Sequence, residues 1–210
     1  KFVIADGLDI FQDVVAYVVL LIALLLFHAA FTYSFFLKAI GGLNPLTFFR
    51  KMKDVALFAF STSSSAATIP VTLRTANQDL GVNQNVASFV VPVGATINMD
   101  GTAIMQGLAT VFIAQMSGID LTLFQYIQVV LLAVATSIGT AAVPSGGTIT
   151  LIIILQQFNL PLEAIGIILA VDRVLDMIRT SVNVTGDAAI ACIVAKTENQ
   201  LDENIFNSKD

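Results

Sequence analysis

The chain of 210 residues is strongly apolar, because hydrophobic residues make up 56% of it and charged residues only 12%, with a formal net charge of −5. Such a composition argues against an ordinary water-soluble domain and is typical of a protein that lies in a lipid bilayer. We therefore expect an all-α membrane protein with several transmembrane passes and no nucleic-acid partner.

The first predicted element is a transmembrane helix. Residues 14–37 carry no formal charge, and about 20 apolar residues suffice to cross a hydrocarbon core about 30 Å thick. A signal peptide is a poorer interpretation, because Asp6, Asp9 and Asp13 stand where such a peptide has basic residues. We assign residues 1–50 to an N-terminal transmembrane helix and a loop. Within it, we interpret His28 as a histidine hydrogen-bonded between helices rather than as a proton relay.

Three later segments are too broken to be simple spans. Residues 51–78 and 121–158 each contain two short apolar stretches joined by a small, polar tip, with Pro70 in the first and Pro144 in the second. This pattern predicts two re-entrant helical hairpins. Residues 84–117 are apolar at both ends but interrupted at residues 98–102, which predicts a broken helix. Irregular backbone at membrane depth persists only where protein or a water-filled cavity satisfies its polar groups.

The two hairpin tips resemble each other. Residues 66–70 read AATIP and residues 140–144 read TAAVP, and a helix with polar residues follows each tip. A hairpin followed by a helix therefore occurs twice. Such weak internal symmetry is typical of secondary transporters, whose binding site lies near the middle of the membrane between the repeats.

The last long segment, residues 162–196, predicts a helix with one polar face. At about 100° per residue, its polar side chains fall within an arc of roughly 100°. Ionisable residues inside a membrane are functional by default, so this face indicates a binding site. The residues after it, 199–210, predict a polar, solvated tail. The polar face consists of Asp172, Asp176, Arg179, Thr180, Asn183 and Asp187.

Four motifs, SSSAATIP, GATINMDGTA, SIGTAAVPSGG and DRVLDMIRTSVNVTGD, occur in this order along the chain. Together they resemble the sodium-coupled glutamate/aspartate transporter homologues, the dicarboxylate/amino acid:cation symporter family, over residues 9–198. The resemblance implies the C-terminal half of a plasma (inner) membrane symporter for an acidic amino acid and Na⁺. It further implies that residues 51–198 form a transport core that moves like an elevator, within a homotrimer joined through N-terminal helices absent here.

Arg179 and Asp176 are the strongest candidates for substrate contact. A planar guanidinium matches a carboxylate bidentately, and the resemblance implies that Arg179 holds the side-chain carboxylate of the substrate. Asp176 suits an α-ammonium group and repels a ligand that bears only carboxylates. An internal ion pair between Arg179 and Asp176 is the alternative. The resemblance adds neutral groups and hairpin-tip amides, where helix N-termini favour anions: Ser64, Ser65, Thr102, Val143, Thr180 and Asn183.

Na⁺ takes oxygen ligands, for which several carbonyl groups and one carboxylate suffice. The resemblance implies three sodium sites, the second completed by ligands outside this chain and the third formed when the second hairpin closes. Their candidate ligands are Asp187, Asn183, Asn98 and the Gly94 carbonyl; Asp100 with Asn98; and the carbonyls of Thr96, Ser137, Ile138 and Thr140 with Met99 nearby.

The sequence also departs from the family. Archaeal members have an arginine at the position of Ser63 and animal members have one at Met177, so Asp176 lacks its expected basic neighbour. Its charge must then be balanced by the substrate, an ion or another residue. Proton-coupled animal members have a glutamate where this chain has Gln106, whose amide does not titrate. We therefore expect no proton coupling through that position.

Other functions fit the sequence less well. A symporter for C4-dicarboxylates or neutral amino acids is the nearest alternative, and an ion channel, also built from broken helices, is the nearest of another class. An intramembrane aspartyl protease does not explain Arg179 or Asn98. A serine hydrolase lacks the G-x-S-x-G context, and His28 is the single histidine. We therefore expect a transporter and not an enzyme.

Overall fold

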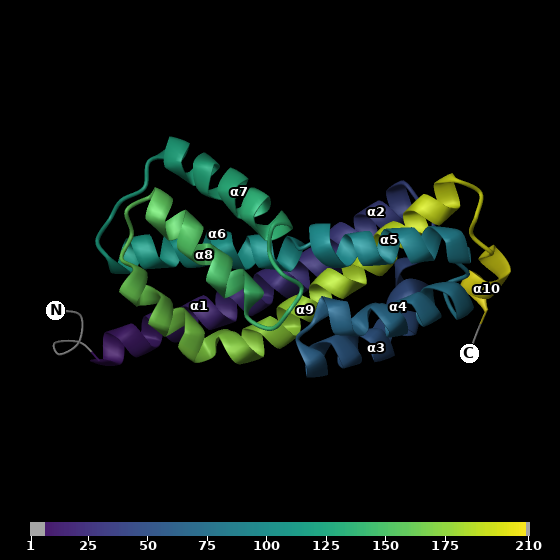
Figure 1. The fold of residues 1–210 in the computed structure, drawn as a ribbon, viewed down its shortest axis with the longest axis horizontal. Helices are drawn as coiled ribbons and strands as arrows, with labels where there is room; N and C mark the ends of the chain where they lie inside the picture. Colours follow the sequence, from purple (N-terminus) through teal and green to yellow (C-terminus); the bar gives the residue numbers. More distant parts are fainter. Residues whose placement is uncertain (1–6, 209–210) are drawn as a thin grey trace.

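The computed structural model describes residues 7–208, and within that range the chain is helical with no β-strand, as the all-α prediction requires. Figure 1 shows an elongated molecule in which α9 runs through the centre, with one helical hairpin towards each end. The helices α1 and α3 to α6 pack along α9. The first six residues of the predicted N-terminal region and the last two of the tail lie outside the described residues.

The N-terminal helix is continuous but not regular. It consists of α1 (Gly7–Phe27), a π-helical segment (His28–Tyr33) and α2 (Ser34–Ala39). Within the described residues, Phe11–Ala39 is the one helix that is long and apolar enough to cross a membrane. Many of its apolar side chains are exposed, for example Val19 and Leu26. The sequence pattern predicts this helix but not its π-helical segment.

The first hairpin consists of α3 (Pro45–Thr62) and α4 (Ser65–Gln78), which pack against each other. Its first arm begins earlier than the predicted start at residue 51, because the Asn44 side chain caps the helix and Pro45 occupies its first position. The tip is tight. Ser63 ends α3 with a left-handed backbone (φ 50°), and the Ser64 side chain then caps α4 by accepting from the amide of Ala67.

The broken helix consists of α5 (Gln84–Ile97) and α6 (Asp100–Met116). Asn98 and Met99 interrupt it with non-helical ψ values of 80° and 53°. The predicted interruption at residues 98–102 is therefore real but shorter. It lies in the middle of the molecule, where α5 and α6 meet (Figure 1).

The second hairpin consists of α7 (Leu123–Ile138) and α8 (Gly146–Gln157), close to the predicted bounds. A capping box between Thr122 and Gln125 fixes the start of α7. The tip between the arms is irregular and ends at Ser145, whose φ of 58° is left-handed. A short 3₁₀ turn (Leu162–Ala164) then leads into α9 (Ile165–Thr197), the predicted polar-faced helix.

The C-terminal segment is mostly exposed to solvent, but it is folded. It forms a short helix, α10 (Glu203–Asn207), and Leu201 pairs with Val82 in an isolated bridge. Phe206 is completely buried. The ammonium group of Lys51 donates to the carbonyl oxygens of Asp79 and Ile205 and to Ser208 Oγ. The segment folds back because one buried aromatic ring and these hydrogen bonds hold it against the base of the first hairpin.

Candidate functional site

The tips of the two hairpins touch in the middle of the molecule. The hydroxyl of Ser64 donates to the carbonyl oxygen of Ala142 at 2.9 Å, and the amide of Ala66 donates to the same oxygen at 3.4 Å. Beneath this contact lies a pocket between the tips, the start of α6 and the polar face of α9. Its volume is about 10 Å³, which is room for about one water molecule.

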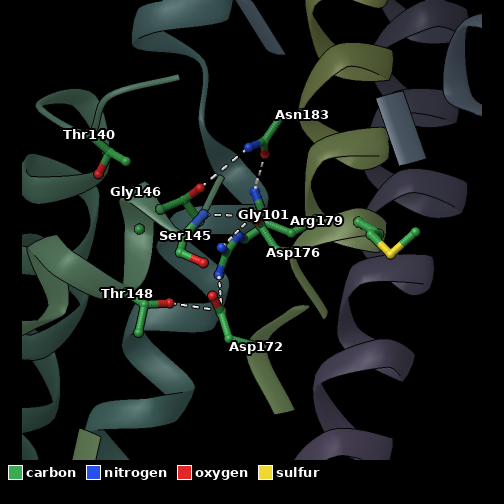
Figure 2. A network of polar contacts seen from close by, with 12 residues as sticks. Gly101, Thr140, Ser145, Gly146, Thr148, Asp172, Asp176, Arg179 and Asn183 are labelled. Atoms are coloured by element: carbon green, nitrogen blue, oxygen red, sulfur yellow. Dashed lines mark hydrogen bonds and ion pairs between the residues drawn. The ribbon is translucent and has the colours of Figure 1, made fainter. Parts of the chain in front are cut away.

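Arg179 lines this pocket and has only 2% of its surface exposed. Its Nη2 donates to Oδ1 of Asp176 at 2.5 Å, and its Nη1 lies 3.5 Å from Oδ1 of Asp172 (Figure 2). Asp172 and Asp176 are equally buried. Because two carboxylates face one guanidinium, this centre carries one negative charge in excess.

Arg179 balances the negative charge of Asp176. The expected basic neighbours are absent, but Arg179 itself, one turn along the same helix, pairs with Asp176. The internal ion pair that the sequence leaves open as an alternative is therefore present. Residues three apart lie on the same helix face, so the pairing follows from their spacing.

Both carboxylates also hold the second hairpin. The amide of Ser145 donates to Oδ2 of Asp176 at 2.9 Å, and the hydroxyl of Thr148 donates to Oδ1 of Asp172 at 2.8 Å (Figure 2). Three buried polar atoms here have no hydrogen-bond partner among the described residues, Arg179 Nη1, Asp172 Oδ2 and Ser63 Oγ. Buried polar atoms of this kind are rare in proteins and mark a place suited to a polar ligand.

Asn183 joins the polar face of α9 to the start of α6. Its Oδ1 accepts from the amide of Gly101 at 2.8 Å, and its Nδ2 donates to the hydroxyl of Thr102 at 3.4 Å. Thr180 lies between this contact and Arg179 along the helix and also lines the pocket.

The pocket gathers most of the residues predicted to contact substrate. Ser64 is the exception, because its side chain caps α4 and ties the tips together instead of lining the pocket. The sequence placed Asp172 on the polar face but assigned it no role of its own, and it did not indicate Thr148 or the Ser145 amide, nor Ser63 as a residue that lines the pocket. The predicted residues that line the pocket are Ser65, Thr102, Val143, Asp176, Arg179, Thr180 and Asn183.

A second polar cluster lies at the break between α5 and α6. The side-chain nitrogen Nδ2 of Asn98 donates to Oδ1 of Asp187 at 2.9 Å. Gly94 lies against the same carboxylate, and a Cβ added at Gly94 would stand 2.6 Å from Oδ1. Asn183 lies one turn before Asp187 on α9. The structure therefore brings the Asp187 carboxylate and the Asn98 side-chain amide together beside Gly94, and their oxygens are of the kind that hard cations take.

Asp100, at the start of α6, contacts the N-terminal helix. Its Oδ2 lies 2.8 Å from Nε2 of His28 and 3.0 Å from the hydroxyl of Tyr33. The prediction that His28 is hydrogen-bonded between helices is confirmed. Sequence reasoning missed Tyr33, because a lone tyrosine in an apolar span carries no pattern of its own.

The third predicted group is only partly assembled. Met99 and Thr140 line the pocket, whereas Thr96, Ser137 and Ile138 do not. The side chains of Thr96 and Ile138 are exposed, and the carbonyl oxygen of Ser137 accepts from the amide of Thr140 in a local turn.

Gln106 braces the second hairpin from α6. Its side-chain nitrogen donates to the carbonyl oxygen of Gly147 and the hydroxyl of Thr150, and its side-chain oxygen accepts from the hydroxyl of Thr136. Thr136 belongs to α7, whereas Gly147 and Thr150 belong to α8. The buried amide is thus fully used in joining the two arms.

Comparison with known proteins shows the family of the chain and several relatives. Residues 1–197 match the sodium:dicarboxylate symporter family. The chain is 41% identical over 191 residues to an excitatory amino acid transporter of Caenorhabditis elegans, which covers 91% of this chain and 38% of the relative. It is 43% identical over 178 residues to human excitatory amino acid transporter 2, and this match covers 85% of the chain and 31% of the relative. It is 40% identical over 196 residues to mouse excitatory amino acid transporter 3, and this match covers 93% of the chain and 38% of the relative. The chain therefore spans less than two fifths of the length of these relatives.

Proposed function

Because the chain belongs to the sodium:dicarboxylate symporter family, we propose that it forms the substrate-binding part of a membrane symporter that moves an acidic amino acid, aspartate or glutamate, together with Na⁺. The family is one of transporters and not of enzymes. The elevator movement of residues 51–198 and a homotrimer joined through further helices remain part of this proposal, as does location in the plasma (inner) membrane. They rest on the resemblance of the motifs to the family.

The proposed substrate rests mainly on one observation. Arg179 is buried and pairs with both Asp172 and Asp176. An acidic amino acid can replace the ion pair between Arg179 and Asp176 with two new ion pairs of its own. Its side-chain carboxylate takes Arg179, and its ammonium group takes Asp176. Each buried charge then keeps a partner, which matters because an unpaired buried charge costs about 3–5 kcal/mol.

The same arrangement disfavours the alternative substrates. A C4-dicarboxylate brings two negative charges to a centre that already has one in excess. A neutral amino acid has no side-chain carboxylate to offer Arg179. An ion channel does not require a buried guanidinium that matches a carboxylate, so the arrangement favours a carrier.

Binding also requires the second hairpin to move. The pocket of about 10 Å³ does not admit an amino acid, and the bonds from Ser145 and Thr148 hold this hairpin over the ion pair. When a ligand takes Asp176, the bond from Ser145 must be remade. We therefore propose that the tip of the second hairpin is the gate of the site, with Ser65 and Val143 of the two tips facing the α-carboxylate.

For Na⁺, the cluster of Asp187, Asn98, Asn183 and the Gly94 carbonyl is the best assembled of the proposed sites. The close approach of Gly94 to Asp187 supports it, because a side chain there would fill the space beside the carboxylate. Asp100 with Asn98 remains the second proposed site. The third, from Thr96, Met99, Ser137, Ile138 and Thr140, requires movement of the second hairpin.

In liposomes that contain the full-length protein, an inward Na⁺ gradient should drive uptake of labelled aspartate or glutamate in a fixed ratio to Na⁺. A symporter couples the two fluxes, whereas a pore does not. The measurement compares labelled amino acid and sodium fluxes at several gradients. Uptake that proceeds equally well with K⁺ in place of Na⁺, or a ratio that drifts with the gradient, contradicts the proposal. Labelled succinate and serine test the alternative substrates.

Gly94→Ala should weaken Na⁺ binding at the Asp187 site by about tenfold or more, because disturbing the groups that orient a metal ligand typically lowers metal affinity 10–100-fold. The new methyl group would stand 2.6 Å from Oδ1 of Asp187 and would force the carboxylate aside. Gly107→Ala, on the other half of the broken helix, is the control, because its Cβ meets nothing within 4 Å. Calorimetric titration with NaCl measures both. Equal Na⁺ affinities in the two variants argue against this site.

A further inference from the structure

The N-terminal helix changes from α to π geometry at one place, residues His28–Tyr33. The π-helix is rare and occurs frequently at functional sites. In an α-helix, side chains five residues apart point about 140° away from each other. In a π-helix, residues five apart are linked by a backbone hydrogen bond, so their side chains point in more similar directions than in an α-helix. The π geometry therefore places His28 and Tyr33 on the same face.

Both side chains contact the same oxygen atom of Asp100. Nε2 of His28 lies 2.8 Å and the hydroxyl of Tyr33 lies 3.0 Å from the same oxygen, Oδ2 of Asp100. The two rings stand edge to face, with centroids 5.0 Å apart. Because a carboxylate accepts hydrogen bonds, both contacts are donated to Asp100. Among the described residues, no hydrogen bond reaches its other oxygen, Oδ1.

Helix α9 leaves space for the Tyr33 hydroxyl. Its hydroxyl also lies 3.2 Å from the carbonyl oxygen of Val182, so its proton is shared between two acceptors. A Cβ added at Gly186 would stand 2.7 Å from this hydroxyl and 2.8 Å from Nδ2 of Asn98. Three elements thus converge on the break in the helix, and glycine on α9 is what lets them approach.

We propose that the π-helical segment positions the Asp100 carboxylate for a cation, with Tyr33 and His28 as positioning residues that fix Oδ2 and leave Oδ1 for the ion. This inference rests on the proposed sodium-coupled function. Fixing a carboxylate by outer hydrogen bonds orients it for its ion, and removing such partners typically lowers metal affinity 10–100-fold.

Tyr33→Phe tests this with the removal of one hydroxyl group and little change in packing. In the full-length protein, we expect about a tenfold lower Na⁺ affinity, measured by titration with NaCl. Tyr17→Phe is the matched control, because Tyr17 lies buried on the same helix and its hydroxyl has no hydrogen-bond partner among the described residues. Its Na⁺ affinity should stay unchanged.

A double-mutant cycle of Tyr33→Phe and Asp100→Ala shows whether Tyr33 acts by positioning Asp100 or only stabilises the fold. In an Asp100→Ala background, Tyr33→Phe should cause no further loss of Na⁺ affinity, because the carboxylate that it positions is gone. Thermal unfolding in Na⁺-free buffer reports any purely structural effect. A Tyr33→Phe variant with normal Na⁺ affinity, or a loss of the same size in both backgrounds, overturns the inference.

Gly186→Ala gives an independent route to the same result should Tyr33→Phe fold poorly. It should displace the Tyr33 hydroxyl and lower Na⁺ affinity, whereas Gly166→Ala on the same helix, with nothing within 4 Å of its Cβ, should not. Equal Na⁺ affinities in these two variants also overturn the inference. Absence of Na⁺ binding in the unmodified protein contradicts the proposed function instead, so the two failures are distinguishable.

Discussion

Arg179→Cys is expected to abolish binding of acidic amino acids, with affinity for aspartate falling by at least about 100-fold. Arg179 is the cation in the pocket, and it has only 2% of its surface exposed. Its loss leaves the substrate carboxylate without a partner, and an uncompensated buried charge costs about 3–5 kcal/mol. Each 1.4 kcal/mol corresponds to about a tenfold change in affinity. Binding of labelled aspartate to the purified full-length protein measures the effect.

Two further variants show whether the loss is specific. Arg173→Cys removes an arginine from the exposed face of the same helix and should leave aspartate binding unchanged. Arg179→Lys keeps the charge but not the planar fork, so its affinity should be intermediate. Because Arg179→Cys also leaves Asp172 and Asp176 without a cation, thermal unfolding should be followed in parallel. A well-folded Arg179→Cys variant with normal aspartate affinity refutes the role proposed for Arg179.

Gly146→Ala is expected to remove most of the mutual enhancement between Na⁺ and substrate. A Cβ at Gly146 would stand 2.4 Å from the backbone oxygen of Ala141, so the tip of the second hairpin must change shape. That tip provides the Ser145 amide to Asp176 and the Ala142 oxygen to the first hairpin. Allosteric coupling typically changes affinity by about 5–150-fold and is reciprocal. In this variant, we expect the factor to fall close to one.

Calorimetric titration of aspartate at low and high Na⁺, and of Na⁺ with and without aspartate, gives the coupling factor in both directions. Gly139→Ala is the matched control at the other end of the tip, because its Cβ meets only the Thr136 oxygen at 3.7 Å. It should keep the coupling of the unmodified protein. A coupling factor unchanged in Gly146→Ala rules out the hairpin tip as the element that links the two ligands.

The sequence by itself determined the features that depend on neighbours along the chain. Helix ends follow from local capping, as at Asn44 and Thr122, and the interruption at Asn98 follows from polar residues within an apolar helix. The polar face of α9 follows from helical spacing alone, since residues three and four apart share a face. For the same reason, most residues predicted to contact substrate do line one pocket.

Only the tertiary structure decided which partner each polar group takes. Spacing brings Asp172, Asp176 and Arg179 to one face, but the contacts of Asp172 and Asp176 with Thr148 and Ser145 require α8 to lie opposite. Tyr33 and Asp100 are 67 residues apart in sequence, and Lys51 and Ile205 are 154 apart. A helical period fixes the direction of a side chain relative to its own helix and carries no information on the element that packs against it. The long-range packing of whole helices therefore decided both the π-helical contact with Asp100 and the burial of Phe206 in the C-terminal segment.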